Sequence, residues 1–272
     1  MSPEAMTPRP PTPPGGGRFH PSATGFDGAA DAYERGRPEY PAGAIETLAR
    51  ECGIGPGRAV LDLAAGTGKL TRLLVPLGAD VVAVEPVEGM RRAFAGLLPH
   101  VPILDGTAEA IPLHDASRDA VVVGQAFHWF DADRALRDIH RVLRGGGSLG
   151  LVWNVRDESA PWVARLTGII EPYRGGTPTH RNERWREGFD RSTLFSSLRA
   201  WSCPYEQRVT VDGLVDRVLS ISFIARLSEA ERAAVGDRVR ALAAGGPNAD
   251  GGPTFVLPYR TDVYTADRLD VS

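Results

Sequence analysis

Short apolar runs alternate with longer amphipathic segments between residues 59 and 153 of this chain. The runs are rich in Val, Leu and Ile and almost continuous, as in strands whose two faces are both covered by helices. Such an alternation is typical of βα units around a parallel sheet, so we predict an α/β fold. The expected strands are residues 59–63, 80–85, 101–105, 119–123 and 148–153, with a further strand at 254–264.

A well-defined helix is predicted at residues 131–144. Its apolar residues recur at the spacing of one helical face. They are Ala132, Ala135, Leu136, Ile139, Val142 and Leu143. Asp131 is placed to cap the start of the helix, and glycines 145–147 are expected to end it. Ser228 and Glu231 have the spacing of a capping box and predict another helix start.

The composition indicates a globular chain with one atypical end. With 272 residues, of which 42% are hydrophobic, the chain can bury a full core. Residues 1–24 are rich in Pro and Gly, so we predict a disordered tail there and a single domain at 25–272. We find no apolar run with the length of a secretory signal or a membrane span, which predicts a cytoplasmic protein without membrane contact.

Charge and cysteine content argue against several function classes. The net charge of -3 gives no general attraction to nucleic acid. Cys52 and Cys203 are the only cysteines, and their separation suits neither a disulfide framework nor a structural zinc site. We therefore expect no metal site and no nucleic-acid partner.

The strongest chemical signal is the segment VLDLAAGTGKLT at residues 60–71, where a strand runs through small residues into a helix. Gly66 and Gly68 remove side chains that would keep a ligand from the backbone. The next strand ends at Glu85, whose carboxylate could accept hydrogen bonds from both hydroxyls of a ribose. Thr71 replaces the third small residue of a dinucleotide fingerprint. The segment therefore indicates a nucleoside site that suits a pyrophosphate less well.

Five segments resemble, in order, the motifs of class I S-adenosylmethionine (SAM)-dependent methyltransferases, in particular the small-molecule group called type 11. They are VLDLAAGTGKLT, VVAVEP, DGTAEAIP, AFHWFD and RVLRGGG within residues 60–147, preceded by a similar leading segment at 26–41. The resemblance implies a Rossmann-like, doubly wound, mostly parallel sheet of seven strands whose last strand is antiparallel. It also implies SAM as the cofactor and a small-molecule methyl acceptor, with the enzyme a monomer or a homodimer.

The same resemblance implies a set of cofactor-binding residues. They are Tyr33, Arg37, Asp62, Ala64, Gly66, Gly68, Glu85, Thr107, Ala108 and Gln125. Asp62, Ala64 and Gly66 would lie around the methionine part of SAM. Glu85 would bind the ribose, and Thr107 and Ala108 would flank the adenine. Many relatives have Gly in place of Ala64, and alanine is still small enough for a close approach to the backbone. Many also have an acid in place of Thr107, so this chain offers the adenine amino group backbone groups and a hydroxyl.

His128 follows the fourth expected strand, in the motif AFHWFD. In the family this loop faces the transferring methyl group, so the imidazole could act as a catalytic base toward a hydroxyl or amine of the acceptor. The alternative is a histidine that only packs or hydrogen-bonds within the loop. Trp129 and Phe130 are expected to form walls of the pocket.

Residues 155–200 interrupt the expected return to the sheet and combine aromatic rings with arginines. They include Trp162, Tyr173, Trp185 and Phe189, with Arg174, Arg181, Arg184 and Arg186. This insertion could cap a pocket for a flat or acidic acceptor. A charged surface excursion is the alternative.

Two other functions share some of these features. A nicotinamide-dependent oxidoreductase would use the same strand, turn and acidic residue, although Thr71 and the later motifs suit it poorly. A SAM-binding protein without transferase activity would keep the cofactor motifs. Binding of SAM compared with NAD separates the first alternative from a methyltransferase, and turnover separates the second.

Overall fold

The computed structural model describes residues 37–248 and 252–270. The predicted tail at residues 1–24 and Tyr33 of the leading segment lie outside the described residues. In the part of the chain that is described, every helix is too short or too polar to cross a lipid bilayer.

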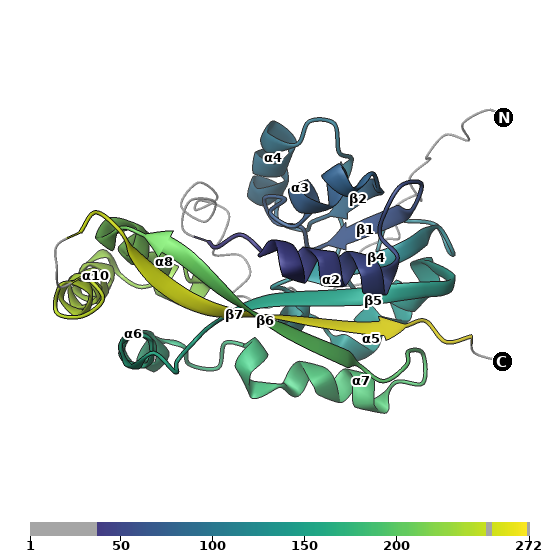
Figure 1. Ribbon diagram of the computed structural model, residues 1–272. Coiled ribbons are helices and arrows are strands. Elements are labelled where there is room, and N and C mark those ends of the chain that lie inside the picture. Colours follow the sequence, from purple (N-terminus) through teal and green to yellow (C-terminus); the bar gives the residue numbers. More distant parts are fainter. Residues whose placement is uncertain (1–36, 249–251, 271–272) are drawn as a thin grey trace.

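Seven strands form one sheet in the order β3-β2-β1-β4-β5-β7-β6 (Figure 1). All the strands expected from the sequence are present, although β3 is shorter than expected and β5 and β7 are longer. The strands are β1 Ala59–Leu63, β2 Asp80–Val84, β3 Ile103–Leu104, β4 Arg118–Gly124, β5 Leu143–Arg156, β6 Arg199–Val209 and β7 Phe255–Asp267.

The sheet is mostly parallel. Strand β1 pairs in parallel with β2 and β4, β2 with β3, and β4 with β5, whereas β7 runs antiparallel to β5 and β6. The predicted Rossmann-like fold with an antiparallel last strand is therefore confirmed. Because β1, β2 and β4 are parallel, the loops after Leu63, Val84 and Gly124 meet at one edge of the sheet, where the strand order reverses.

Helices cover both faces of the sheet. On one face α2 and α3 pack in a core that includes Leu48 and Val60, and on the other face α5 and α7 pack in a core that includes Leu61 and Ile139. Neighbouring residues of β1 thus face opposite cores, as the two-residue period of a strand requires. The helices here are α2 Ala42–Cys52, α3 Thr71–Leu74, η2 Val75–Leu77, α4 Glu88–Leu97, η3 Phe127–Trp129, α5 Ala132–Val142, η6 Arg184–Arg186 and α7 Glu187–Arg191.

Helix α5 begins as predicted but ends earlier. The carboxylate of Asp131 accepts a hydrogen bond from the backbone N–H of Arg134 at 3.2 Å and caps the helix. The helix ends at Val142, because the backbone then becomes extended and continues directly as β5. The prediction that glycines 145–147 end the helix is wrong, since they lie within β5, where its register with β4 is irregular.

Strand β6 was not expected from the sequence. It forms an edge of the sheet, which explains why it tolerates Pro204. One end of the β6–β7 pair carries a second group of helices (Figure 1), whose separate apolar core includes Leu214 and Leu257. The predicted capping box of Ser228 and Glu231 starts the longest of them. These helices are α6 Pro161–Ile170, η4 Glu171–Tyr173, α8 Val211–Leu219, α9 Ser222–Ala225 and α10 Glu229–Ala244. The short helix η5 His180–Asn182 instead places the ring of His180 against Trp153 and Trp185 of the core beside α5.

Candidate functional site

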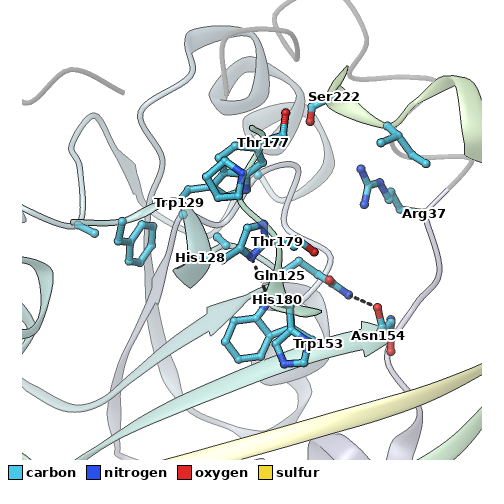
Figure 2. Close-up of a pocket in the computed structure, with 18 of the residues that line it drawn as sticks. Arg37, Gln125, His128, Trp129, Trp153, Asn154, Thr177, Thr179, His180 and Ser222 are labelled. Carbon is cyan, nitrogen blue, oxygen red and sulfur yellow. Dashed lines mark hydrogen bonds between the residues drawn. The ribbon is translucent and has the colours of Figure 1, made fainter. Parts of the chain in front are cut away.

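The loops at the carboxyl ends of β1, β2 and β4 line a cavity of about 410 Å³ (Figure 2). The predicted site residues that line it are Arg37, Ala64, Gly66, Glu85, Thr107, Ala108, Gln125 and His128. Asp62 lines a narrower pocket. This pocket shares with the cavity Arg37, Ala64, Gly66, Gly124, Gln125 and Arg217. Gly68 lines neither space. Residues chosen from separate sequence motifs therefore come together at one edge of the sheet.

The turn after β1 contains three residues with a left-handed backbone. The φ angles of Ala64, Gly66 and Gly68 are 58°, 58° and 88°, and this conformation costs an alanine about 1 to 2 kcal/mol. A Cβ on Gly66 would meet no other atom within 4 Å. A Cβ on Gly68 would lie 2.5 Å from Cδ1 of Leu98 and 2.9 Å from Cδ2 of Phe94. Gly66 therefore leaves room beside the cavity, while Gly68 is required for the close packing of α4.

Glu85 follows β2 and is fixed by the backbone at the cavity. Its Oε2 accepts a hydrogen bond from the N–H of Gly66, and its Oε1 accepts one from the N–H of Val87, both at 2.9 Å. Burial raises the pKa of this carboxyl, and the two hydrogen bonds oppose that rise. Because each carboxylate oxygen can accept more than one hydrogen bond, a ligand with two neighbouring hydroxyls can still donate to Glu85.

Asp62 is buried near the end of β1. Its Oδ2 accepts a hydrogen bond from the hydroxyl of Thr71 at 2.5 Å, while Oδ1 is buried without a hydrogen-bond partner among the described residues. Burial raises the pKa of Asp62 to about 7; the charge of Glu85 adds to this rise and the Thr71 hydrogen bond opposes it. A nearby cationic ligand group would favour the charged form of this carboxyl. Thr71 thus holds Asp62 in place, a role that its sequence position did not indicate.

Thr107 and Ala108 belong to a tight turn after β3. The carbonyl of Thr107 accepts a hydrogen bond from the N–H of Ala110 at 3.2 Å. Gly106 before it has no room for a side chain, since a Cβ there would lie 2.5 Å from Cδ of Pro112. Thr107 and Ala108 share the cavity wall with the apolar side chain of Met90 and can accommodate a flat ring.

Gln125 follows β4 and also has a left-handed backbone, with φ at 60°. Its Nε2 donates to the carbonyl of Asn154 at 3.5 Å (Figure 2), and Asn154 Nδ2 donates to the carbonyl of Glu39 at 2.9 Å. Asn154 Oδ1 accepts a further bond from the Thr261 hydroxyl at 2.6 Å. These bonds connect the start of the described chain, which includes Arg37, to the end of β5 at the cavity.

His128 lies in η3 and points toward Trp153 of β5 (Figure 2). The indole N–H of Trp153 donates to His128 Nδ1 at 3.3 Å. Nδ1 is therefore unprotonated, and the neutral ring carries its proton on Nε2. Burial, with a smaller contribution from the charges of His180 and Arg37, lowers the pKa of His128 to about 3. His128 is consequently neutral near pH 7, with Nε2–H as a hydrogen-bond donor.

The insertion at residues 155–200 lines the cavity with two of its predicted arginines, Arg174 and Arg181, and with other residues that its aromatic and arginine content did not indicate. Thr177 and His180 line the cavity, and both ring nitrogens of His180 are buried without a hydrogen-bond partner among the described residues. Burial lowers the pKa of His180 to about 4. The rings of Trp185 and Phe189 instead pack in the core beside α5. His180 carried no sequence motif that would have identified it.

The second group of helices also reaches the cavity, which the sequence did not predict. Arg217 of α8 and Ser222 of α9 line it, together with Arg156 at the end of β5 and Tyr259 of β7. These residues are distant from the recognisable motifs and come together only through the β6–β7 pair.

Proteins described as methyltransferases match most of the chain. The sequence profile of the methyltransferase domain matches residues 61–151. An uncharacterized methyltransferase of Mycobacterium tuberculosis is 44% identical over 239 residues, which cover 87% of this chain and 92% of the relative. A methyltransferase-like protein of Schizosaccharomyces pombe is 35% identical over 237 residues, with the same coverage of 87% and 92%.

The fold comparison agrees with the sequence comparison. The structure resembles that of a protein of Anaeromyxobacter dehalogenans described as a type II methyltransferase, with a TM-score of 0.65 and 27% identity over 85% of this chain and 97% of that one. The chain therefore belongs to the class I SAM-dependent methyltransferases.

Proposed function

We propose that the cavity binds SAM and that the enzyme transfers its methyl group to a small-molecule acceptor. The observation that carries this proposal is the carboxylate of Glu85, buried beside the cavity and fixed by the N–H groups of Gly66 and Val87. A carboxylate held in this way suits the paired hydroxyls of a ribose. In this assignment Thr107 and Ala108 flank the adenine.

The charge of SAM also suits the proposed site. SAM carries a positive sulfur and an amino group, and Asp62 provides a buried carboxyl whose Oδ1 has no hydrogen-bond partner among the described residues. Ala64 and Gly66 leave room for the methionine part beside it. Arg37 and Gln125 line both spaces and would help to orient its carboxylate and amino groups.

When bound, SAM would supply a methyl group on a positively charged sulfur; an acceptor atom bonds to the methyl carbon in line with the sulfur, which is the leaving group. The protein then needs chiefly to align two molecules and exclude water. With its proton on Nε2, His128 would hold an acceptor oxygen or nitrogen by donating a hydrogen bond, in place of the base role considered from the sequence. His180 would be the imidazole that can accept a proton, because neither of its ring nitrogens has a hydrogen-bond partner among the described residues. The insertion at 155–200 would close the acceptor end of the cavity.

The purified protein is expected to bind SAM and its demethylated product S-adenosylhomocysteine, because Glu85 suits a ribose. It is not expected to bind NAD, because the buried carboxyl of Asp62 beside the turn suits the positive charge of SAM and not a negatively charged pyrophosphate. Isothermal titration calorimetry measures this binding. Labelled SAM in a metabolite extract, followed by mass identification of the labelled product, then tests transfer and names the acceptor. Absence of saturable binding of either nucleoside at millimolar concentration would contradict the cofactor assignment. Tight binding without labelled product from extracts that contain the acceptor would favour a SAM-binding protein without transferase activity.

The ring of His128 is expected to stay neutral from pH 5 to pH 8, because burial lowers its pKa to about 3. In protein labelled with ¹⁵N-histidine, its signals should show the tautomer with the proton on Nε2, and His128→Asn assigns them by their loss. Trp153→Phe is the control: it removes the indole N–H but keeps an aromatic ring, so the tautomer preference should weaken while the ring stays uncharged. Titration near the ordinary histidine value of about 6.5 would instead support the general-base role.

A further inference from the structure

Two arginines that line the cavity, Arg156 and Arg217, form no ion pair with a carboxylate of the described residues. Arg217 of α8 is 8% exposed, and its Nε and Nη1 are buried without a hydrogen-bond partner among residues 37–248 and 252–270. Arg156 at the end of β5 has a buried Nε that also lacks a partner within this part of the chain. Buried charged groups are normally paired, because an unpaired one forfeits its hydration without compensation.

The other arginines at this end of the cavity already have carboxylate partners. Arg174 pairs with Glu171 at 2.6 Å, and Arg181 pairs with Glu158 at 2.5 Å. Glu171 lines the cavity, whereas Glu158, whose charge also raises the pKa of Arg156, is held by Arg181. Arg156 and Arg217 are therefore left as an excess of positive charge.

The surroundings of these two guanidinium groups favour an anion. Arg156 is paired in register with Tyr259 of β7, whose buried hydroxyl has no hydrogen-bond partner among the described residues. Burial lowers the pKa of Arg156 to about 10, and the positive charge of Arg217 contributes to this shift. Two like charges that disfavour each other in the ligand-free protein would both be stabilised by one negative group.

The cavity wall also contains apolar side chains. Ile170, Ile221 and Phe223 line it, together with the indole of Trp153. A ligand that places a negative group at the arginines would therefore bury an apolar or aromatic body against these side chains.

We propose that the methyl acceptor carries an anionic group, a carboxylate or a phosphate on an apolar body, and that Arg156, Arg217 and the hydroxyl of Tyr259 bind this group. That the ligand is the methyl acceptor rests on the proposed function; the anion site itself does not. Guanidinium groups suit both anions, since each can accept two parallel hydrogen bonds from one arginine.

Calorimetry with small aromatic probes tests this site. Benzoate represents the carboxylate, phenyl phosphate represents the phosphate, and benzamide is the uncharged control of the same shape. At least one of the two anions should bind the parent protein at least about tenfold more tightly than benzamide, because charged partners make the stronger hydrogen bonds to arginine. The anion that binds more tightly identifies the class of acceptor.

Substitution of the arginines assigns the site. Arg217→Met and Arg156→Met should each weaken anion binding at least about tenfold, while Arg174→Met, which removes an arginine already paired with Glu171, should bind like the parent. Arg217→Lys keeps the charge if the methionine variant fails to fold. Binding of S-adenosylhomocysteine, measured on each variant, reports whether the cofactor half is intact.

The outcomes separate the two proposals. Two results would overturn the anion site even if SAM binds. One is that neither anion binds more tightly than benzamide, and the other is that the parent and both methionine variants bind the anions equally. Anion binding that depends on Arg156 and Arg217 in a protein that does not bind SAM would keep the site and overturn the proposed cofactor.

Discussion

Asp62→Asn is expected to remove a pH-dependent loss of stability from the ligand-free enzyme. Burial raises the pKa of Asp62 to about 7 in the folded protein, whereas an unfolded aspartate has a pKa of about 3.9. The folded state therefore holds this proton more tightly, so the contribution of Asp62 to stability is complete below pH 4 and is lost as the pH rises through about 7. Between pH 5 and pH 8 the expected loss is about 2 to 3 kcal/mol.

Urea unfolding at several pH values measures this effect. The free energy of unfolding of Asp62→Asn, relative to the parent, should increase by that amount from pH 5 to pH 8. Asp119→Asn is the matched control: burial alone would raise the pKa of Asp119, but the N–H of Ala59 and the guanidinium of Arg144 lower it. Its difference from the parent should stay constant over the same range. A constant difference for Asp62→Asn would mean that Asp62 is ionised in the folded protein throughout.

The same carboxyl should make SAM binding depend on pH. A positive ligand favours the charged form of Asp62, so below about pH 7 binding must first displace its proton, at a cost of about 1.4 kcal/mol per pH unit. The parent should therefore lose up to about tenfold in affinity from pH 7 to pH 6, and Asp62→Asn should not.

The sheet and the cofactor loops were predictable because each depends on a short local pattern. A run of β-branched residues specifies a strand, and a turn of small residues marks where a ligand can approach the backbone. Gly66 and Glu85 are 19 residues apart, yet they meet because parallel neighbouring strands end at the same edge. Their contact follows from topology alone.

Other features depend on long-range packing that a short pattern does not specify. Strand β6 contains Pro204, which weakens any strand prediction, and it is stable only as an edge beside β7. Arg217 lies in α8, whose sequence contains no recognisable motif. It lines the cavity only because the β6–β7 pair carries the second group of helices there. The low pKa of His128 depends on burial, and its tautomer depends on a hydrogen bond from Trp153, 25 residues further along the chain.

Glu85→Ala is expected to weaken SAM binding by about 2 to 3 kcal/mol, which is a factor of roughly 30 to 150. The substitution removes the carboxylate proposed for the ribose and leaves the N–H groups of Gly66 and Val87 without their acceptor. Glu109→Ala is the matched control, because Glu109 also lines the cavity and accepts a backbone hydrogen bond, from Asp131 at 3.0 Å. Its affinity for SAM should stay within about threefold of the parent.

A comparison of two ligands separates a ribose contact from a general disturbance of the glycine turn. The parent should bind S-adenosylhomocysteine at least about tenfold more tightly than its 2′-deoxy form, because only the former donates both hydroxyls to Glu85. Glu85→Ala should bind the two ligands about equally, since the partner of the missing hydroxyl is gone. Loss of affinity for both ligands with their preference retained would assign Glu85 a structural role in the turn alone. The melting temperature of each variant, measured without ligand, shows whether the fold is retained.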